Sequence, residues 1–359
     1  MPKPLQRNGN ITFYRGDWAK KLGKAEPKSP DELNALLVAF TKNDPDGNGQ
    51  ADTWGTGRYG SGWSGWDDSR LADNMFGVPF NWRKNPDGTM THQIETDEYR
   101  QSLDFQRKLF ADGAFHPDAG AMTFAQAQAA YLAGKTGAHS EGIGNFYSPT
   151  AAGTVYYKIR QANPQAELLG LLPSGPGGAK AVTRNTQGSF GFTGIPARVG
   201  RDQERVKELL RVLDYLASPF GSEEWIFLNN GLEGVHHTVR SEGVRVMTEK
   251  GNTERGDLVY IMAGLPVLFY PEAPEDAIKA QRLATDVFKI GIDDPTWPLY
   301  SATNVQKAAE LNQFGFDRAT AIITGREPFS TLDAAIRDWK SRGGDQIRKE
   351  FEQSLKESS

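Results

Sequence analysis

Apolar residues recur at helical spacing along much of the chain. In the clearest case Leu33, Leu36, Leu37 and Phe40 stand at i, i+3, i+4 and i+7, which predicts an amphipathic helix over about 31–43. The preceding run Ser-Pro-Asp-Glu is a capping box with proline at the first helical position. Similar patterns predict helices at about 97–112, 123–132, 202–217, 222–230, 302–324, 331–342 and 345–356.

Strand patterns are fewer and shorter. They predict strands at 11–14, 136–139, 154–159, 168–172 and 190–196. Because these strands are interleaved with the helices, the expected fold class is α/β. The segment 173–188 is rich in glycine, proline and polar residues, and this composition predicts a crossing or hinge loop.

Composition narrows the class of protein. The chain has 359 residues, no cysteine and a formal net charge of -4. The absence of cysteine excludes disulfides and thiolate chemistry. The mild acidity argues against a nucleic-acid partner, because no basic stripe is present to neutralise phosphates. The longest apolar runs are too short to span a bilayer, so no direct membrane insertion is expected. The first residues lack the apolar region of a signal peptide.

The sharpest local motif is a loop at 44–52. Oxygen-bearing side chains at loop positions 1, 3, 5 and 9 can surround a hard cation, since alternate side chains point into one concave turn. Here those side chains are Asp44, Asp46, Asn48 and Asp52, with the carbonyl of Gln50 at position 7. Position 12, where an EF-hand carries a bidentate Glu, holds glycine. The spacing therefore predicts a structural Ca²⁺ site, and the alternative is a metal-free turn.

Aromatic residues gather in the glycine-rich stretch that follows. Trp54, Tyr59, Trp63 and Trp66 stand among glycine, serine and aspartate. Flat rings beside polar groups suit sugar recognition, because the C–H face of a pyranose packs on an indole. The alternative is that these tryptophans anchor a core. Neither H-E-x-x-H nor G-x-S-x-G occurs, and the case for catalysis is weak.

Several segments, taken in order, resemble one family. They are GNITFYRGDWAKKLG, AFTKNDPDGNGQADTWG, TDEYRQSLDFQRKLFADGAFHPD, FAQAQAAYLAGKTGAHSEG, RVLDYLASPFGSEEWIFLNNGLEGVHH and AIITGREPFSTLDAAIRDWKSRGGDQIRKEF. This ordered set is similar to the family 1 extracellular solute-binding proteins of ABC transporters. The similarity is greatest to their lipoprotein-like and alginate-binding-like branch.

The resemblance implies a periplasmic-binding-protein-like type II α/β fold, with two lobes joined by a hinge. By this resemblance, residues 1–172 and 295–359 would form the second lobe, and 173–294 the remainder of the first. The chain resembles a family member without its N-terminal part, so the first lobe is expected to be incomplete. An extracytoplasmic location, periplasmic or cell-surface, and ABC transporter membrane subunits as partners are implied as well.

The resemblance also implies site residues. The calcium ligands would be Asp44, Asp46, Asn48, the carbonyl of Gln50, and Asp52, with Thr53 where the branch often has Glu. The ligand contacts would come from aromatic and polar groups at the cleft between the lobes. The candidates are Trp63, Trp66, Glu141, Asn145, Tyr147 and His236.

The expected function is capture of a carbohydrate, in particular an oligosaccharide, by closure of two lobes for ABC import. No enzymatic activity is expected. Two alternatives remain open at this point. One is a calcium-stabilised carbohydrate-active enzyme, and the other is a fragment of the family that binds nothing.

Overall fold

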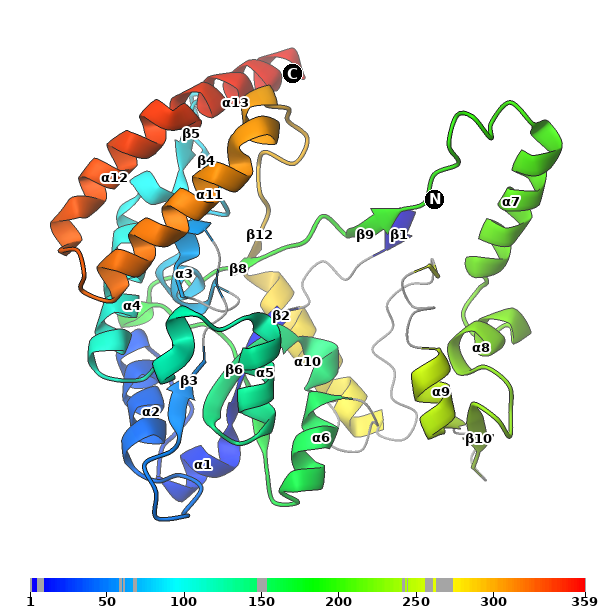
Figure 1. Ribbon diagram of the computed structural model, residues 1–359, viewed down its shortest axis with the longest axis horizontal. Helices are drawn as coiled ribbons and strands as arrows, with labels where there is room; N and C mark the ends of the chain where they lie inside the picture. The colour runs from blue at the N-terminus through cyan, green and yellow to red at the C-terminus, as the bar shows by residue number, and fades with distance from the viewer. Residues whose placement is uncertain are drawn as a thin grey trace. The chain divides into compact units, whose positions relative to one another are not determined.

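The computed structural model describes residues 2–4, 10–57, 60, 62–66, 70–146, 154–240, 243, 245–255, 261–262 and 274–358 (Figure 1). The chain divides into two compact units. The large unit comprises Asn10–Ile143, Ile159–Asn185 and Leu283–Ser359, and the small unit Met1–Gly9, Gly144–Lys158 and Thr186–Arg282. The lobe boundaries predicted at 172/173 and 294/295 stay a prediction.

The main sheet of the large unit has the strand order β3-β6-β2-β7. β2 (Asn10–Arg15) is antiparallel to β6 (Thr136–Gly142) and to β7 (Leu168–Leu171), while β3 (Trp54–Thr56) is parallel to β6. Helices α1 (Gly16–Lys21), α2 (Pro30–Lys42) and α5 (Phe124–Leu132) lie beside this sheet (Figure 1). The strands predicted at 11–14, 136–139 and 168–172 are confirmed.

Helix α2 shows how the apolar stripe builds the core. The Ser29 hydroxyl accepts a hydrogen bond from the Glu32 N–H at 3.2 Å, as the capping box predicts. The four apolar residues of the stripe are all buried, and each contributes roughly 1.5–3 kcal/mol to folding. Phe40 reaches the sheet because residue 137 is glycine, since a Cβ there would lie 2.2 Å from the Phe40 ring.

A helical layer follows in the large unit. It contains α3 (Leu71–Phe76), α4 (Asp97–Ala111), α11 (Ala302–Ile323), α12 (Leu332–Trp339) and α13 (Asp345–Glu357). A π-helical segment, Lys340–Gly344, joins α12 to α13. The hairpin of β4 (Trp82–Lys84) and β5 (Met90–His92) packs on α13. β8 (Thr183–Arg184) pairs in parallel with β12 (Gly291–Ile292).

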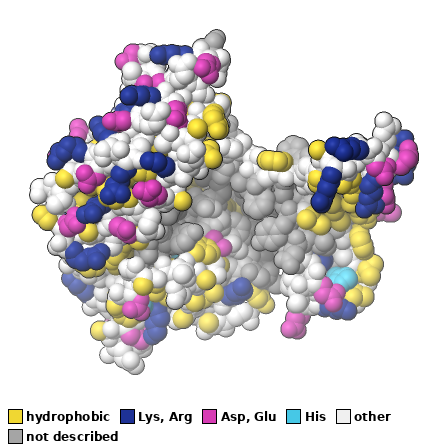
Figure 2. Space-filling view, turned by 45° about the horizontal axis from the view of Figure 1, so that its top comes forward, with side chains coloured by type: hydrophobic (Ala, Val, Ile, Leu, Met, Phe, Trp, Pro, Cys, Tyr) yellow, Lys and Arg dark blue, Asp and Glu magenta, His cyan; other side chains and the backbone are white. Residues whose placement is uncertain are grey.

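In its described residues, the small unit contains two strand pairs and several helices. β1 (Pro2–Pro4) pairs with β9 (Ser189–Phe192), and β10 (His237–Val239) pairs with β11 (Arg245–Met247), both antiparallel. The helices are α7 (Gln203–Leu216), α8 (Glu223–Asn230) and α9 (Glu249–Glu254). Large apolar side chains remain exposed on this unit (Figure 2); they include Leu210, Val212, Tyr215, Phe220, Phe227 and Leu232.

The chain passes from one unit to the other five times, and two of these crossings lie within helices α6 (Val155–Ala162) and α10 (Pro274–Lys289). Among the residues that the structure describes, the 3-10 turns are η1 (Gly62–Ser64), η3 (Gln93–Glu95), η4 (Pro117–Gly120), η5 (Ile143–Asn145), η6 (Pro176–Gly178) and η8 (Phe329–Thr331).

The prediction of a strand at 154–159 is wrong, because this segment starts helix α6. The Thr154 hydroxyl accepts from the Tyr157 N–H at 3.1 Å and so caps the helix. Val155 and Ile159 are both buried and stand at i, i+4. Their β-branched character favoured a strand, whereas their spacing on the apolar face determines the helix. The segments that were predicted as helices are confirmed, and most of their ends agree to within about two residues.

Candidate functional site

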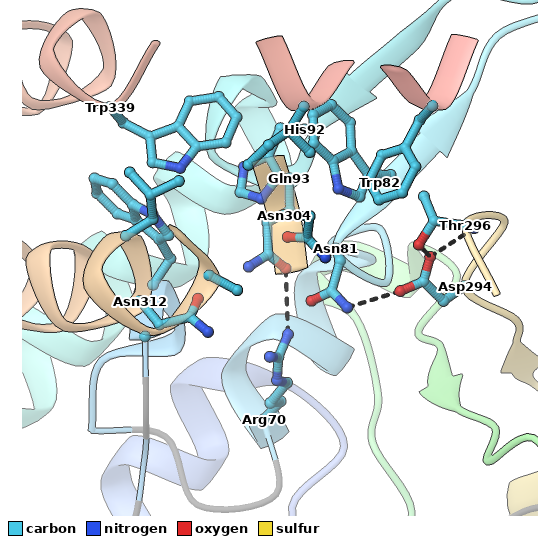
Figure 3. A pocket seen from close by; sticks show the side chains of 16 residues that line it. Arg70, Asn81, Trp82, His92, Gln93, Asp294, Thr296, Asn304, Asn312 and Trp339 are labelled. Atoms are coloured by element: carbon cyan, nitrogen blue, oxygen red, sulfur yellow. Dashed lines mark hydrogen bonds between the residues drawn. The ribbon is translucent and has the colours of Figure 1, made fainter. Parts of the chain in front are cut away.

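A cavity of about 310 Å³ lies in the large unit. Its walls come from the β4–β5 hairpin, η1, the segment 294–296 and the three C-terminal helices (Figure 3). The lining residues are Gly62, Trp63, Arg70, Asn81, Trp82, His92, Gln93, Asp294, Thr296, Asn304, Ala308, Leu311, Asn312, Trp339, Ile347 and Phe351. They divide into an aromatic group and an amide-rich polar group.

The aromatic group is a set of rings in mutual contact. His92 stacks on Trp339 with centroids 4.3 Å apart, and Trp82 meets His92 edge-on at 4.8 Å. Phe351 of α13 contacts Trp82 at 5.7 Å. These distances lie in or near the range of favourable ring pairs. The rings therefore form a rigid apolar wall.

The polar group contains amides, a carboxylate and an arginine. Asn81 Nδ2 donates to Asp294 Oδ2 at 2.7 Å, and the Thr296 hydroxyl donates to Asp294 Oδ1 at 2.6 Å. Arg70 Nη1 donates to Gln93 Oε1 at 3.3 Å. In Figure 3, Trp339 lies at the upper left, Asn312 at the left, Asp294 and Thr296 at the right, and Arg70 at the bottom.

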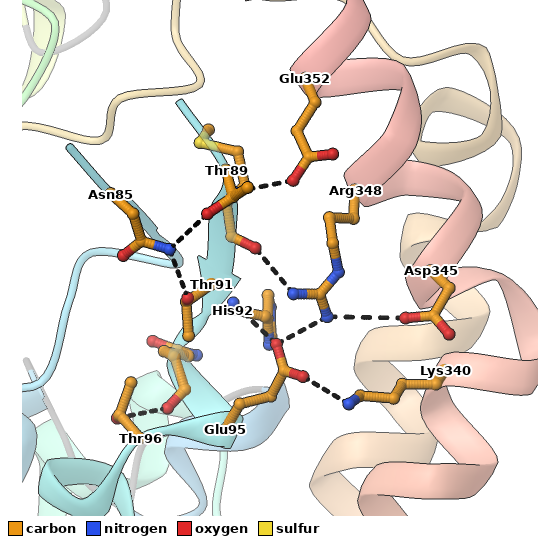
Figure 4. Close-up of polar contacts among 12 residues, drawn as sticks. Asn85, Thr89, Thr91, His92, Glu95, Thr96, Lys340, Asp345, Arg348 and Glu352 are labelled. Atoms are coloured by element: carbon orange, nitrogen blue, oxygen red, sulfur yellow. Dashed lines mark hydrogen bonds and ion pairs between the residues drawn. The ribbon is translucent and has the colours of Figure 1, made fainter. Parts of the chain in front are cut away.

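A partly buried ion-pair network supports the aromatic wall (Figure 4). Glu95 accepts from Arg348 Nη2 and pairs with Lys340 Nζ, both at 2.7 Å, and it also accepts from the His92 N–H at 3.0 Å. Arg348 Nη1 donates to the Met90 carbonyl at 2.7 Å. Burial opposes ionisation of Glu95, but Lys340 and Arg348 outweigh it and hold the pKa of Glu95 below its usual value.

His92 is electrically neutral within this wall. Burial lowers the pKa of His92 to about 3, although the Glu95 carboxylate acts in the opposite direction. A neutral imidazole offers one donor and one acceptor nitrogen. The wall therefore carries no positive charge from His92 near neutral pH.

The loop at 44–52 has the curvature that its sequence predicts. Both oxygens of Asp44 accept backbone N–H groups, Oδ1 from Gly47 at 2.9 Å and Oδ2 from Gly49 at 3.0 Å. The Asn48 Nδ2 group donates to Asp46 Oδ2 at 2.9 Å and to Asp52 Oδ1 at 3.1 Å. The three carboxylates therefore converge on one small region.

Electrostatics differ among these three carboxylates. Partial desolvation opposes ionisation of Asp44, but backbone N–H groups outweigh it and lower its pKa. Desolvation, followed by a hydrogen bond shared with Asp44, raises the pKa of Asp46. The hydrogen bond from Lys135 lowers the pKa of Asp52.

The donor chemistry of the loop fits calcium, because carboxylate, amide and carbonyl oxygens are the ligands that Ca²⁺ prefers. Asp44, Asp46, Asn48, Gln50 and Asp52 would hold the ion. Within the described ranges, however, no cluster of three or more His, Cys, Asp or Glu residues is arranged to hold a metal. The carboxylates are instead engaged by N–H groups, the Asn48 amide and a lysine.

The predicted ligand residues occupy different places. Trp63 lines the cavity. Trp66 is in the core, where its Nε1 donates to the Thr320 hydroxyl at 3.1 Å. Glu141 on β6 accepts from Gln128 Nε2 at 2.7 Å.

The remaining predicted ligand residues lie in the small unit or beyond the described part. Asn145 ends η5 in the small unit. His236 closes a turn there, accepting from the Leu232 N–H and contacting Glu254 Oε2, both at 2.9 Å. Tyr147 lies outside the described residues. A ligand-binding role for each of the six residues stays a prediction.

Most cavity residues had no signal in the sequence. They come from 62–93 and 294–351, segments that only tertiary packing brings together. Trp82 and Trp339 were detectable as tryptophans, but nothing in their neighbours indicated a common site. The amides on α11, such as Asn304 and Asn312, resemble ordinary polar positions on a helix.

Solved structures with the same fold are solute-binding proteins. One is a human-milk-oligosaccharide (HMO) binding, ABC-transporter-associated solute-binding protein from Bifidobacterium longum infantis, with a TM-score of 0.68 and 19% identity. The match covers 97% of this chain and 73% of that one. Another is the Streptococcus pneumoniae substrate-binding protein FusA, an EF-hand mutant in complex with fructo-nystose. It has a TM-score of 0.65 and 15% identity, over 99% of this chain and 75% of that one. The predicted periplasmic-binding-protein-like α/β fold is confirmed.

Two curated relatives align with most of the chain. Lipoprotein LipO of Bacillus subtilis (strain 168) is 28% identical over 358 residues, covering 94% of this chain and 67% of LipO. The polygalacturonan/rhamnogalacturonan-binding protein YtcQ of the same organism is 25% identical over 365 residues, covering 99% of this chain and 69% of YtcQ. No family model matches the chain. No helix in the described part is long and apolar enough to cross a membrane.

Proposed function

We propose that this chain is a substrate-binding protein that captures a carbohydrate, in particular an oligosaccharide, for an ABC importer. The observation that carries this proposal is the cavity of the large unit, where an aromatic wall faces amides and a carboxylate. The names of YtcQ and of the human-milk-oligosaccharide binding protein support the ligand class.

The lining suits a sugar for chemical reasons. Amide side chains both donate and accept hydrogen bonds, as sugar hydroxyls do. The apolar wall matches the C–H faces of the sugar ring. The cavity lies near the lower end of the roughly 300–1,000 Å³ typical of small-molecule sites. It would therefore hold one part of an oligosaccharide.

Binding without catalysis explains the site more simply than an enzyme does. Canonical glycosidases use two carboxyl groups that flank the scissile bond. Among the described residues that line the cavity, Asp294 is the one carboxylate, and it already accepts hydrogen bonds from Asn81 and Thr296. The expected partners are the transporter's membrane subunits, in an extracytoplasmic location, periplasmic or cell-surface.

A panel of neutral and acidic oligosaccharides tests the proposal. We expect saturable heat in isothermal titration calorimetry for at least one glycan, together with a change in tryptophan fluorescence, because tryptophans line the cavity. Product analysis after incubation distinguishes binding from catalysis, and intact glycan is the expected result. Cleavage by purified protein would instead support the carbohydrate-active enzyme.

The loop at 44–52 adds a second part to the proposal, a structural Ca²⁺. Bound calcium would neutralise and cross-link the converging carboxylates. The phrase "EF-hand" in the name of the FusA structure supports it. We expect Asp44→Asn to abolish most calcium stabilisation in thermal unfolding, because binding to the native state raises its stability.

Asp87→Asn is the matched control. Asp87 accepts from the Thr89 N–H at 3.0 Å in an exposed turn, so it resembles Asp44 locally but stands outside the loop. If calcium raises the unfolding temperature of the wild type and of Asp44→Asn equally, the proposed Ca²⁺ site is contradicted.

A further inference from the structure

Lys135 lies against the last side-chain ligand position of the loop at 44–52. Its ammonium pairs with Asp52 Oδ2 at 2.5 Å, while Asp52 Oδ1 accepts from Asn48 Nδ2 at 3.1 Å. Both oxygens of Asp52 are therefore engaged by donors from the chain itself.

The main sheet determines this position of Lys135. Trp54 pairs with Thr136 in the parallel register of β3 and β6, and the Trp54 N–H donates to the Lys135 carbonyl at 2.9 Å. Lys135 is thus held beside the end of the loop by sheet pairing. The Lys135 side chain is 43% exposed and that of Asp52 is 28% exposed, so sheet pairing fixes the backbone position from which the ion pair is made.

The neighbouring residues do not replace Asp52 as a ligand. The Thr53 hydroxyl donates to the Phe40 carbonyl at 2.9 Å and is buried, so it points into α2 and its core. A second ammonium also lies near the loop, since a Cβ placed on Gly47 would come within 2.3 Å of Lys21 Nζ.

We propose that Lys135 is a built-in counter-cation of the loop. It neutralises Asp52 while calcium is absent and competes with calcium for the same carboxylate. The loop then keeps its fold without metal, and calcium binds more weakly than the ligand set alone would allow. This inference rests on the calcium part of the proposed function.

Two measurements on Lys135→Met test the inference. Removing the ammonium leaves Asp52 Oδ2 without its ion-pair partner, so we expect calcium to bind roughly fivefold more tightly or better in isothermal titration calorimetry. In chelator, the same variant should unfold at a lower temperature than the wild type, because the carboxylates repel one another. Saturating calcium should remove that difference.

Lys108→Met is the matched control. Lys108 of α4 pairs with Asp31 of α2 at 3.0 Å, and its side chain is exposed to a similar extent as that of Lys135. We expect wild-type calcium affinity for this control. Lys135→Gln, checked by circular dichroism, repeats the test with a polar replacement of the lysine.

The outcomes separate the two proposals. If the wild type binds calcium and both Lys135 variants bind it equally or more weakly, the counter-cation role is overturned while the calcium site stands. If neither the wild type nor any variant binds calcium, both fail, and the carbohydrate proposal is unaffected. Calcium binding that appears only in the Lys135 variants supports the counter-cation role.

Discussion

His92 is a buried titratable residue of the candidate site. Burial lowers its pKa to about 3, while an unfolded histidine titrates near 6.5. Between these two pH values the unfolded chain binds a proton that the folded chain excludes. The contribution of neutral His92 to the free energy of unfolding is therefore fully present above pH about 6.5. It is lost as the pH decreases, by up to about 1.4 kcal/mol per pH unit for one such group.

We expect His92→Gln to reduce this pH dependence. Urea unfolding of the wild type and the variant at pH 7, 6 and 5 measures it. The wild type should lose more stability than His92→Gln over this interval. His139, whose pKa burial lowers to about 4, is present in both proteins, so the difference isolates His92. Identical slopes would contradict the buried, neutral state of His92.

Sequence reasoning could not separate Trp63 from Trp66. Both stand in the same glycine-rich stretch, yet Trp63 lines the cavity and Trp66 packs against Phe110 and Phe115. The difference arises from α11, where Gly315 makes room for Trp63 and Thr320 accepts from Trp66. These contacts cross more than 250 residues and leave no local pattern.

At the scale of elements, α13 holds the β4–β5 hairpin that carries Trp82 and His92. Arg348 makes the connection, with hydrogen bonds to the Met90 carbonyl and to Glu95. It also lies 5.7 Å from the centroid of the Trp82 ring. Arg348 is therefore one of the α13 residues that hold the cavity wall, together with Phe351 and Glu352.

We expect Arg348→Met to destabilise the protein by roughly 1–3 kcal/mol, because it removes the hydrogen bonds from Arg348 to the Met90 carbonyl and to Glu95. Lys349→Met is the control, since Lys349 is the next residue and is exposed. Thermal or urea unfolding measures both. A loss no larger in Arg348→Met than in Lys349→Met would show that the network does not stabilise the hairpin.

Some helices and strands were predicted correctly from the sequence, and others were not. Long helices with a clear apolar stripe and a cap, such as α2, followed from the sequence. The three-residue strands β3, β4 and β5 did not, because so short a run carries no period. Helix α6 was mistaken for a strand, since tertiary burial of two β-branched residues outweighed their local preference.

At the scale of the whole molecule, the ordered family resemblance predicted the fold, and the solved structures confirm it. It did not predict the cavity of the large unit, whose lining residues are drawn from segments far apart in the chain. A shared fold brings such segments together, whereas the identities of their side chains differ from one protein to another. This is why ligand specificity varies among proteins of one architecture.

The central claim is that the cavity of the large unit binds carbohydrate, and Asn312 offers the most direct test. Asn312 is an exposed residue of α11 that lines the cavity, whereas its neighbour Gln313 lies outside the lining and donates to Asp317 at 2.8 Å. Isothermal titration with the glycan that the wild type binds compares Asn312→Ala with Gln313→Ala. Loss of one hydrogen bond predicts roughly fivefold weaker binding for Asn312→Ala and wild-type affinity for Gln313→Ala. Equal affinities of the two variants would contradict the claim, as would a panel in which no glycan binds the wild type.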